Sequence, residues 1–515
     1  MDHCADFMSS LYRKGVKLWL DDDKLHYRAG KGILTTEDTA ALRRMKEEII
    51  RVLKQRRSAT IESSDFALQK TIDLAPLTVQ QESIWRGIQL GGLSYLNPFV
   101  LRISGPLNTE ILRRSFEEIV RRHGSLRTRV VLLDGVPKQR IDEPQEYPLK
   151  VVNCSTMPQA EVDAQVQDLV DEVCNQDCDM AVGPLFQTRL IRLKDDEHLL
   201  IWSIHHIVSD GFSCRLMFRE LWLSYSELVQ ERPSPLQTPA MQYANYAIWQ
   251  REAQRTSMQS QELYWQQRLN GAAAIRWPVD KCESTMNRHP SDWNSMGIRF
   301  SQESNDGLRK SAARAGTTLA MAILAVYVAS VSRLCNQSDF VVSISVTGRD
   351  RPGLQSMAGY VAHGLYLRIQ LGGHETLADL LQQVTQEFSQ ALLHQDFGRT
   401  AAGSSDLRAN ALFQWMPWRF DEADGVPEPD VSPKLDIKVE RLPTKVALKK
   451  RSPFQTTYKC DIMTLFADAA ESIDGGFGYR PSAFAANMGE RFASILRSTG
   501  NQLARTPYSR VADRS

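Results

Sequence analysis

The sequence predicts a mixed α/β (α+β) protein with more than one domain. At 515 residues the chain is too long for one ordinary hydrophobic core, so two to four domains are expected. Segments of strand length alternate with helical ones: residues 318–334 predict a helix, and 340–346 predict the strand that follows it. Near the C-terminus, strands over 459–466 and 475–479 precede a last helix over 481–496. This alternation indicates sheets covered by helices.

The first sixty residues predict a small separate unit. Residues 7–13 suit a short helix, and 16–20 and 24–28 suit two strands joined by a turn of three aspartates. A second helix is expected from Thr35, because Asp38 stands at capping-box spacing and the apolar positions that follow recur at helical intervals. The predicted order is helix, hairpin, helix, with a small core and an open strand edge.

This unit is also more basic than the rest of the chain. Residues 1–57 hold thirteen Lys/Arg against nine Asp/Glu, a net charge of +4, while the whole chain carries +1. An open strand edge beside positive charge suits the capture of a short acidic peptide by strand addition. We expect the binding residues on the hairpin: Lys17, Trp19, Lys24, His26 and Arg28. The alternative is that the unit merely decorates the N-terminus.

The stretch His205-His206-Ile207-Val208-Ser209-Asp210-Gly211 carries the most chemistry. Its pattern His-His-x-x-x-Asp-Gly arises by chance about once in a thousand chains of this size. The apolar residues 198–204 before it predict a strand, and residues 213–227 after it predict a buried helix. The histidines therefore end a strand, where a loop can direct them into a cleft. This arrangement is typical of an acyltransferase base.

Two other interpretations of the histidine pair were weighed. Such a pair at a strand end is often structural. A metal site is disfavoured, because no carboxylate or cysteine follows at ligand spacing and adjacent strand residues point to opposite faces. The same alternation separates the two roles, with one histidine facing the cleft and the other packed inward.

Composition excludes several classes of function. The near balance of 62 basic and 61 acidic residues gives no general attraction to nucleic acid. The longest apolar run, residues 319–331, is too short to span a membrane, and Asp2 and Asp6 stand where a signal peptide needs basic residues. Eight scattered cysteines indicate free thiols in a reducing bacterial cytoplasm. No metal or nucleotide site is evident, and a monomer is expected.

The N-terminal unit resembles the β-hairpin docking domains of peptide and polyketide assembly lines. The resemblance rests on residues 14–20, 25–29 and 31–35. In that family the hairpin binds a linear motif at the C-terminus of the upstream protein. The resemblance therefore implies a partner, an upstream acyl or peptidyl carrier protein with an acidic C-terminal motif. After this unit, residues 58–73 predict a linker.

The rest of the chain resembles the condensation domains of nonribosomal peptide synthetases. The matching residues are Leu77-Thr78, Gln81 and Trp85; Arg122-His123-Gly124-Ser125-Leu126-Arg127-Thr128; the His-His loop; Tyr243, Tyr246, Ala247 and Trp249; Gly348-Arg349, Gly359-Tyr360 and Arg368; and His394-Gln395-Asp396. The departures from the family pattern are Ser83, Gly124, Asn245, His363-Gly364 and Gly398. The second half of the chain departs from the family pattern more than the His-His loop does. These departures therefore bear on the identity of the acceptor more than on the reaction type.

The resemblance implies an architecture and a site. Two chloramphenicol-acetyltransferase-like halves, 74–250 and 251–515, are expected to form a V-shaped pseudodimer with the active site at their junction. The catalytic set it implies is His206 as base, His205 beside it, the Gly211 N–H facing the oxyanion, and Asp210 paired with Arg127. His206→Ala is then expected to abolish turnover, and Asp210→Ala to destabilise the fold.

Several subclasses can be weighed. Heterocyclising relatives carry aspartates in place of the histidines, non-catalytic recruitment domains lose the second histidine, and epimerisation domains follow a carrier domain. The preferred expectation is a free-standing enzyme that releases a carrier-bound acyl chain onto a small soluble hydroxyl acceptor. The alternatives are an amide-forming elongation domain from a larger synthetase and a non-catalytic docking scaffold. No cofactor is expected on this chain, since the phosphopantetheine arm belongs to the carrier.

Overall fold

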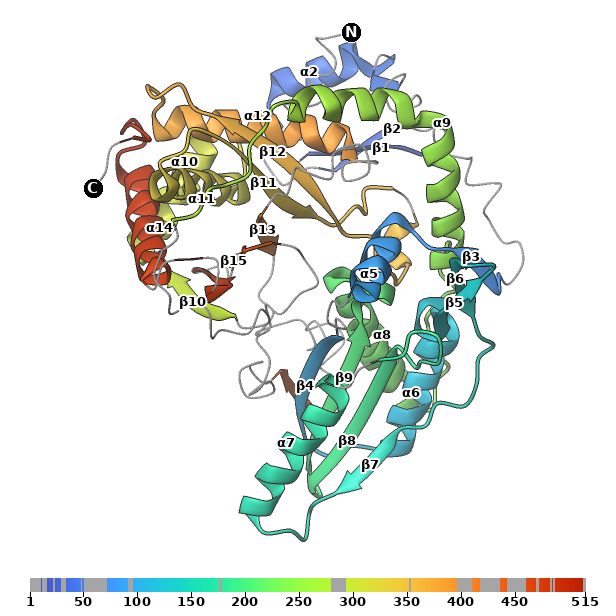
Figure 1. The fold of residues 1–515 in the computed structure, drawn as a ribbon. Coiled ribbons are helices and arrows are strands. Elements are labelled where there is room, and N and C mark those ends of the chain that lie inside the picture. The colour runs from blue at the N-terminus through green and yellow to red at the C-terminus, as the bar shows by residue number, and fades with distance from the viewer. Residues whose placement is uncertain are drawn as a thin grey trace.

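The computed structural model comprises a small N-terminal unit and two larger α/β lobes, with the long helix α9 running from one lobe to the other (Figure 1). It describes residues 11, 16–21, 24–28, 34–47, 49–50, 72–90, 96–175, 178–278, 293–351, 353–395, 410–416, 436–441, 460–468, 472–481, 484 and 487–512. The predicted linker lies mostly outside these residues, and so does most of the predicted first helix.

The N-terminal unit contains a hairpin and a helix where the sequence predicts them. Strand β1 (Lys17–Asp21) pairs antiparallel with β2 (Lys24–Arg28), and α2 (Thr36–Arg44) follows. The predicted capping box is present: the Thr35 hydroxyl accepts from the Asp38 N–H at 3.0 Å, and the Asp38 carboxylate accepts from the Thr35 N–H at 2.9 Å. Two otherwise unpaired amides are thereby satisfied at the start of the helix.

The first lobe is built on a five-stranded sheet. Its strand order is β14 (Lys438–Arg441), β4 (Leu96–Ser104), β9 (Glu197–His205), β8 (Phe186–Lys194) and β7 (Lys150–Asn153). Helices α6 (Thr109–Arg122) and α8 (Gly211–Val229) share one core with the sheet, and α7 (Gln159–Asn175) forms a second core with it. Beside it lie helix α5 (Val79–Gln89) and a three-stranded sheet of β3 (Leu74–Pro76), β6 (Val136–Ile141) and β5 (Thr128–Leu133).

The second lobe is built on a six-stranded mixed sheet. Its order is β10 (Asn294–Arg299), β16 (Ile473–Tyr479), β15 (Ile462–Asp468), β13 (Ala411–Met416), β11 (Asp339–Val346) and β12 (His363–Gln370). The helices that pack with it are α10 (Gln302–Arg314), α11 (Leu319–Cys335), α12 (Leu377–Leu393) and α14 (Met488–Arg505). The predicted helix–strand pair over 318–346 and the predicted last strand pair are observed here.

The two lobes share elements instead of meeting at a clean boundary. Helix α9 (Tyr243–Leu269) passes through residue 250, where the division was expected, so the division falls inside one continuous helix. Its first turns pack in the core of the first lobe, and Trp265 packs in the core of the second. Strand β14 comes from the second half of the sequence yet pairs with β4 of the first lobe.

A short segment strengthens this exchange. Residues 354–361 follow β11 in the chain, but Leu354, Met357, Tyr360 and Val361 are buried in the core of the first lobe. We call residues 359–362 the junction segment. It leads directly into β12 of the second lobe, so its backbone ties the two sheets together.

Two features are absent from the described part of the chain. No single helix there is long and apolar enough to cross a membrane; α10 and α11 pass that test only as a pair, bent by 106°. No three His, Cys, Asp or Glu side chains among the described residues come together as a metal site.

Candidate active site

The His-His loop connects a buried strand to a buried helix. Strand β9 ends at His205, a single 3-10 turn covers His206–Val208, and α8 begins at Gly211 with Asp210 as its N-cap. His205 is fully buried, whereas His206 is half-buried. The two histidines therefore differ in exposure, as the alternation of a strand predicts.

The hydrogen bond of His206 fixes its tautomer. Nδ1 of His206 lies 2.5 Å from the Ser209 carbonyl oxygen. A carbonyl only accepts, so Nδ1 carries the hydrogen and Nε2 carries the lone pair. Burial lowers the pKa of His206 below its usual value, while the bond to Ser209 and the charge of Asp210 act in the opposite direction. At neutral pH the ring is therefore neutral and able to accept a proton at Nε2.

His205 has the opposite tautomer and a structural role. Its Nδ1 accepts from the Ile207 N–H at 3.1 Å, which places the hydrogen on the buried Nε2. Burial, followed by the nearby charge of His206, lowers the pKa of His205 to about 3. It stays neutral at neutral pH and holds the turn that presents His206.

The structure corrects the predicted partner of Asp210. Its carboxylate pairs with Arg349, whose Nη2 lies 3.2 Å from both oxygens, and not with Arg127. The Arg127 guanidinium instead donates to the Val120 carbonyl at 3.0 Å and to the Asp142 carbonyl. Carbonyls at the end of α6 and beside β6 thus hold Arg127 away from the loop. Arg349 was placed in a motif by the sequence but was given no role.

Asp210 joins α8 to the junction segment. One carboxylate oxygen accepts from the Ser213 N–H at 2.8 Å and from its hydroxyl at 2.7 Å. The other accepts from the N–H groups of Val361 at 3.0 Å and Ala362 at 3.1 Å. Although burial alone would raise the pKa of Asp210, Arg349 and these donors lower it overall, so the group is ionised.

Arg349 completes the same network from the second lobe. It donates to the Gly359 carbonyl at 3.0 Å and the Ser213 hydroxyl at 2.8 Å, and its guanidinium lies 4.5 Å from the centre of the Phe212 ring. Its buried charge is thus compensated by one carboxylate and several oxygens, as a buried ion pair requires.

The opening and fourth motifs meet this network. Gln81 of α5 donates to the Ile207 carbonyl at 3.0 Å, and the Thr78 hydroxyl lies 3.0 Å from the Tyr243 hydroxyl. Tyr243 in turn donates to the Tyr360 carbonyl at 2.7 Å. Gln80 of α5 also donates to the Val361 carbonyl, 281 residues away in the sequence, so α5 contacts both the His-His loop and the junction segment.

The second motif braces the helices behind the loop. Arg122 and His123 at the end of α6 both contact Glu220 of α8, with the His123 Nε2 2.6 Å from the carboxylate. Gly124 donates its N–H to the Gln242 side chain at 3.1 Å. Arg127 belongs to this support and does not touch the loop.

The remaining predicted residues lie in two places. Gly211 is half-buried and is the first residue of α8, where intrahelical bonding leaves N–H groups without a carbonyl partner. In the hairpin, Lys17 lies opposite Arg28, and Trp19 lies opposite His26. The five predicted binding residues therefore occupy every second position along each of the two strands. Lys24 and His26 are exposed.

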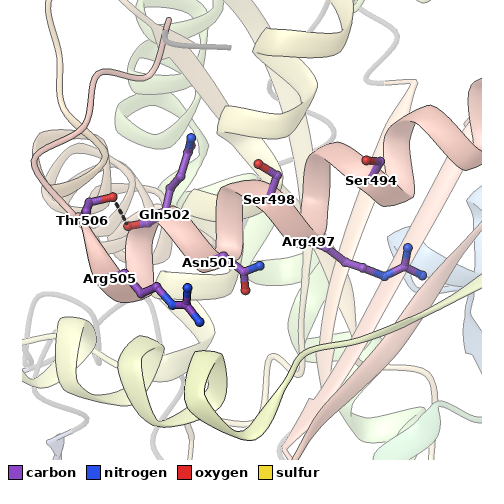
Figure 2. A pocket seen from close by; sticks show the side chains of 7 residues that line it. All are labelled: Ser494, Arg497, Ser498, Asn501, Gln502, Arg505 and Thr506. Carbon is purple, nitrogen blue, oxygen red and sulfur yellow. Dashed lines mark hydrogen bonds between the residues drawn. The ribbon is translucent and has the colours of Figure 1, made fainter. Parts of the chain in front are cut away.

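A separate hollow runs along the outer face of α14 (Figure 2). It is open and is lined by Ser494, Arg497, Ser498, Asn501, Gln502, Arg505 and Thr506. Arg505 pairs with Glu303, and Asn501 accepts from Ser304. It includes none of the predicted catalytic residues.

Comparison with known families agrees with both parts of this geometry. The model of the condensation domain matches residues 71–514, and that of the TubC N-terminal docking domain matches residues 4–55. The chain belongs to the condensation-domain family. Condensation domains are acyltransferases that form amide or ester bonds. They act on acyl groups held by the phosphopantetheine of carrier proteins. This chain belongs to that class of acyltransferases.

Among curated proteins, the chain is similar to Malpinin synthetase of Mortierella alpina. The two are 33% identical over 364 residues, which are 69% of this chain and 5% of that protein. The condensation domain therefore spans only about a twentieth of this relative's length.

Three solved structures show the same fold. The X-domain from teicoplanin biosynthesis gives a TM-score of 0.73 at 18% identity, covering 87% of this chain and 99% of that one. The EpoB NRPS cyclization-docking bidomain from Sorangium cellulosum gives 0.72 at 16% identity and covers 98% of this chain and 99% of that one. The third structure is the SgcC5 protein from Streptomyces globisporus, in complex with (R)-(-)-1-(2-naphthyl)-1,2-ethanediol and sucrose. It gives a TM-score of 0.68 at 20% identity and covers 84% of this chain and 100% of that one.

Proposed function

We propose that this condensation domain takes an acyl chain from the phosphopantetheine thioester of an upstream carrier protein and transfers it to the hydroxyl of a small soluble acceptor. The observation that carries the proposal is the tautomer of His206. Because the Ser209 carbonyl holds the hydrogen on Nδ1, Nε2 is the ring atom that can take a proton from the acceptor. The neutral state of the half-buried ring suits this role at neutral pH.

The chemistry then needs only one proton carrier. The acceptor oxygen attacks the thioester carbonyl while its proton passes to Nε2 of His206. As the tetrahedral intermediate collapses, the carbon–sulfur bond breaks and the proton passes from His206 to the leaving thiolate. An ester and the free thiol of the carrier arm result, and His206 returns to its neutral state.

The developing oxyanion needs hydrogen-bond donors aimed at it. We assign this role to the N–H of Gly211, because it lies at the N-terminus of α8, where the helix dipole favours negative charge. Asp210 and His205 are positioning residues: Asp210 holds the start of α8, and His205 holds the turn that carries His206.

The donor is delivered through the hairpin of the docking domain. The exposed residues Lys24 and His26 lie on β2, and the unit as a whole is basic. We assign Lys17, Trp19, Lys24, His26 and Arg28 to binding an acidic motif at the C-terminus of the carrier protein. Strand addition to an edge of the hairpin would align backbone hydrogen bonds with these side chains.

A hydroxyl acceptor is favoured by three considerations. His363 and Gly364 replace the Asn-Thr pair that the family usually has beside the junction segment, so the acceptor side departs from peptide-forming members. A neighbour of the same fold, SgcC5, is in complex with a diol. The architecture is also similar to that of the condensation enzyme that releases the enacyloxin polyketide by esterification, and the ester choice follows that analogy.

Amide formation on an aminoacyl carrier protein is the second candidate. It is favoured by the similarity to Malpinin synthetase, a much longer protein of which this chain matches 5%. In this case the nucleophile is an amine, and His206 would perform the same proton transfer.

The test is a competition between matched acceptors. A carrier protein with an acidic C-terminal tail is loaded with an acyl chain and offered a hydroxy acid, the amino acid of the same carbon skeleton, or an aminoacyl carrier protein. Intact-protein mass spectrometry follows loss of the acyl group. Release by the hydroxy acid alone supports the ester proposal. Transfer only to the aminoacyl carrier would establish amide formation and overturn it.

A further inference from the structure

Tyr360 lies directly against the proposed base. The centres of the Tyr360 and His206 rings are 4.4 Å apart, and their planes are inclined by 51°. Tyr360 is only 6% exposed and packs in the core of the first lobe, although it belongs to the segment that leads into the second. An aromatic ring from the second half of the sequence therefore lies in tilted contact with His206.

The backbone on both sides of Tyr360 is held tightly. The Gly359 N–H donates to the Ser213 hydroxyl at 3.0 Å, and the Tyr360 carbonyl accepts from Tyr243 at 2.7 Å. The next two N–H groups donate to Asp210. A residue whose neighbours are fixed in this way presents its side chain in one direction.

These contacts leave the His206 ring little freedom. One edge of the ring is fixed through Nδ1 by the Ser209 carbonyl, and the ring packs against Tyr360. Rotation about the ring torsion, which is soft in an isolated histidine, would break the bond to Ser209 and change the packing against the tyrosine ring. The direction of Nε2 is therefore set jointly by the loop and by the junction segment.

We propose that Tyr360 is a positioning residue for the acyl-transfer reaction, whose ring orients the imidazole of His206 toward the acceptor. This inference rests on the proposed function of His206. It makes Asp210 and Arg349 indirect contributors to catalysis, because they hold the segment that carries Tyr360. The other titratable groups at this junction are His205, Tyr243 and His363.

Two substitutions separate the ring from the hydroxyl. Tyr360→Phe keeps the ring, and Tyr360→Leu keeps apolar bulk but removes the aromatic face. We measure single-turnover transfer from a soluble acyl-pantetheine thioester across pH, together with the titration of His206 by NMR of protein labelled with ¹⁵N-histidine, assigned through His206→Gln. Thermal unfolding reports whether each variant folds.

The expected result is that Tyr360→Phe retains the rate within about twofold, whereas Tyr360→Leu slows transfer by about 10- to 100-fold. In Tyr360→Leu the midpoint of the His206 titration should also rise, because the ring loses part of its burial. Equal rates and equal titrations in Tyr360→Leu and wild type would overturn the inference, as would equal losses in both variants. If wild type and His206→Gln transfer at the same rate, the proposed function itself fails, and the titration still reports on the ring contact.

Discussion

Asp210 shows how one side chain organises two halves of a protein. It ends the proposed catalytic loop, yet its carboxylate contacts are structural: the first turn of α8, the junction segment and Arg349. Both members of the Asp210–Arg349 pair are almost completely buried. A buried charge that loses its partner is strongly destabilising, whereas a surface pair contributes little.

We therefore expect Asp210→Asn to lower the free energy of unfolding by about 3–5 kcal/mol. Asp142→Asn is the matched control, because Asp142 pairs with Arg129 at the surface and should cost at most about 1 kcal/mol. Urea denaturation at pH 7.5 measures both. Equal losses in the two variants would show that the junction does not depend on the buried pair.

His205 gives the fold a defined sensitivity to acid. Its pKa is lowered to about 3 in the folded state, so below pH 6.5 the unfolded chain binds a proton that the folded chain does not. The contribution of His205 to the free energy of unfolding is complete above the pKa of histidine in the unfolded chain, and it is lost as pH falls toward about 3. Between pH 6.5 and pH 5 the loss of unfolding free energy from this residue is about 2 kcal/mol.

His205→Asn should remove this component, because the asparagine oxygen can still accept from the Ile207 N–H but does not titrate. We expect the variant to lose less unfolding free energy than wild type between pH 6.5 and pH 5. The exposed His26→Asn is the matched histidine-to-asparagine control and is measured over the same pH range. An unaltered slope in His205→Asn would contradict the assignment of a buried neutral His205.

At the scale of elements, the junction depends on a close approach of the backbone to an aromatic ring. A Cβ added at Gly359 would lie 2.2 Å from the Tyr243 ring, which starts α9. The ring is fully buried and holds hydrogen bonds to Thr78 and Tyr360, so it has no room to retreat. Glycine at this position is a steric requirement of the contact between α9 and the junction segment.

Gly359→Ala is thus expected to destabilise the protein by about 3 kcal/mol. Gly297→Ala is the control, since a Cβ at Gly297 of β10 meets nothing within 4 Å, and it should change stability by at most about 0.5 kcal/mol. Thermal and urea unfolding compare the two. A Gly359→Ala protein as stable as the control would mean that α9 and the segment are less closely packed than described.

Local elements were predicted better than the contacts between them. The capping box at Thr35 and Asp38 depends on residues three positions apart. The strand before His205 was predicted from the run of apolar residues within the strand itself. The Asp210–Arg349 pair joins residues 139 apart, and nothing local to either one identifies the other. The prediction chose Arg127 through a family analogy, and carbonyls near α6 hold that side chain instead. The ring of Tyr360 against His206 was unpredictable for the same reason.

At the scale of the whole molecule, we propose separate tasks for the docking unit and the condensation domain. The docking unit, residues 1–57, carries a net charge of +4 and bears no predicted catalytic residue, while the proposed chemistry lies at the junction of two lobes. A charge change on the hairpin should therefore alter the capture of the donor carrier and leave the chemical step intact. Electrostatic capture of this kind weakens as salt rises.

Lys24→Glu is expected to raise the KM for a carrier protein with an acidic C-terminal tail by about tenfold at low salt, with kcat unchanged. Lys310→Glu, an equally exposed change on α10, is the control and should leave KM as in wild type. The same assay with a soluble acyl-pantetheine thioester should not distinguish the variants. Equal KM values for Lys24→Glu and Lys310→Glu would remove the hairpin from carrier recognition.

In the proposed reaction, His206 moves the proton during acyl transfer. Single-turnover loss of the acyl group from a loaded carrier protein, followed by intact-protein mass spectrometry, measures this role in wild type and His206→Ala. We expect His206→Ala to react about 10²- to 10⁴-fold more slowly at unchanged thermal stability. Wild-type activity should also fall at acid pH, with a midpoint below 6.5, because burial lowers the pKa of His206. A folded His206→Ala protein that transfers the acyl group at the wild-type rate would contradict the account.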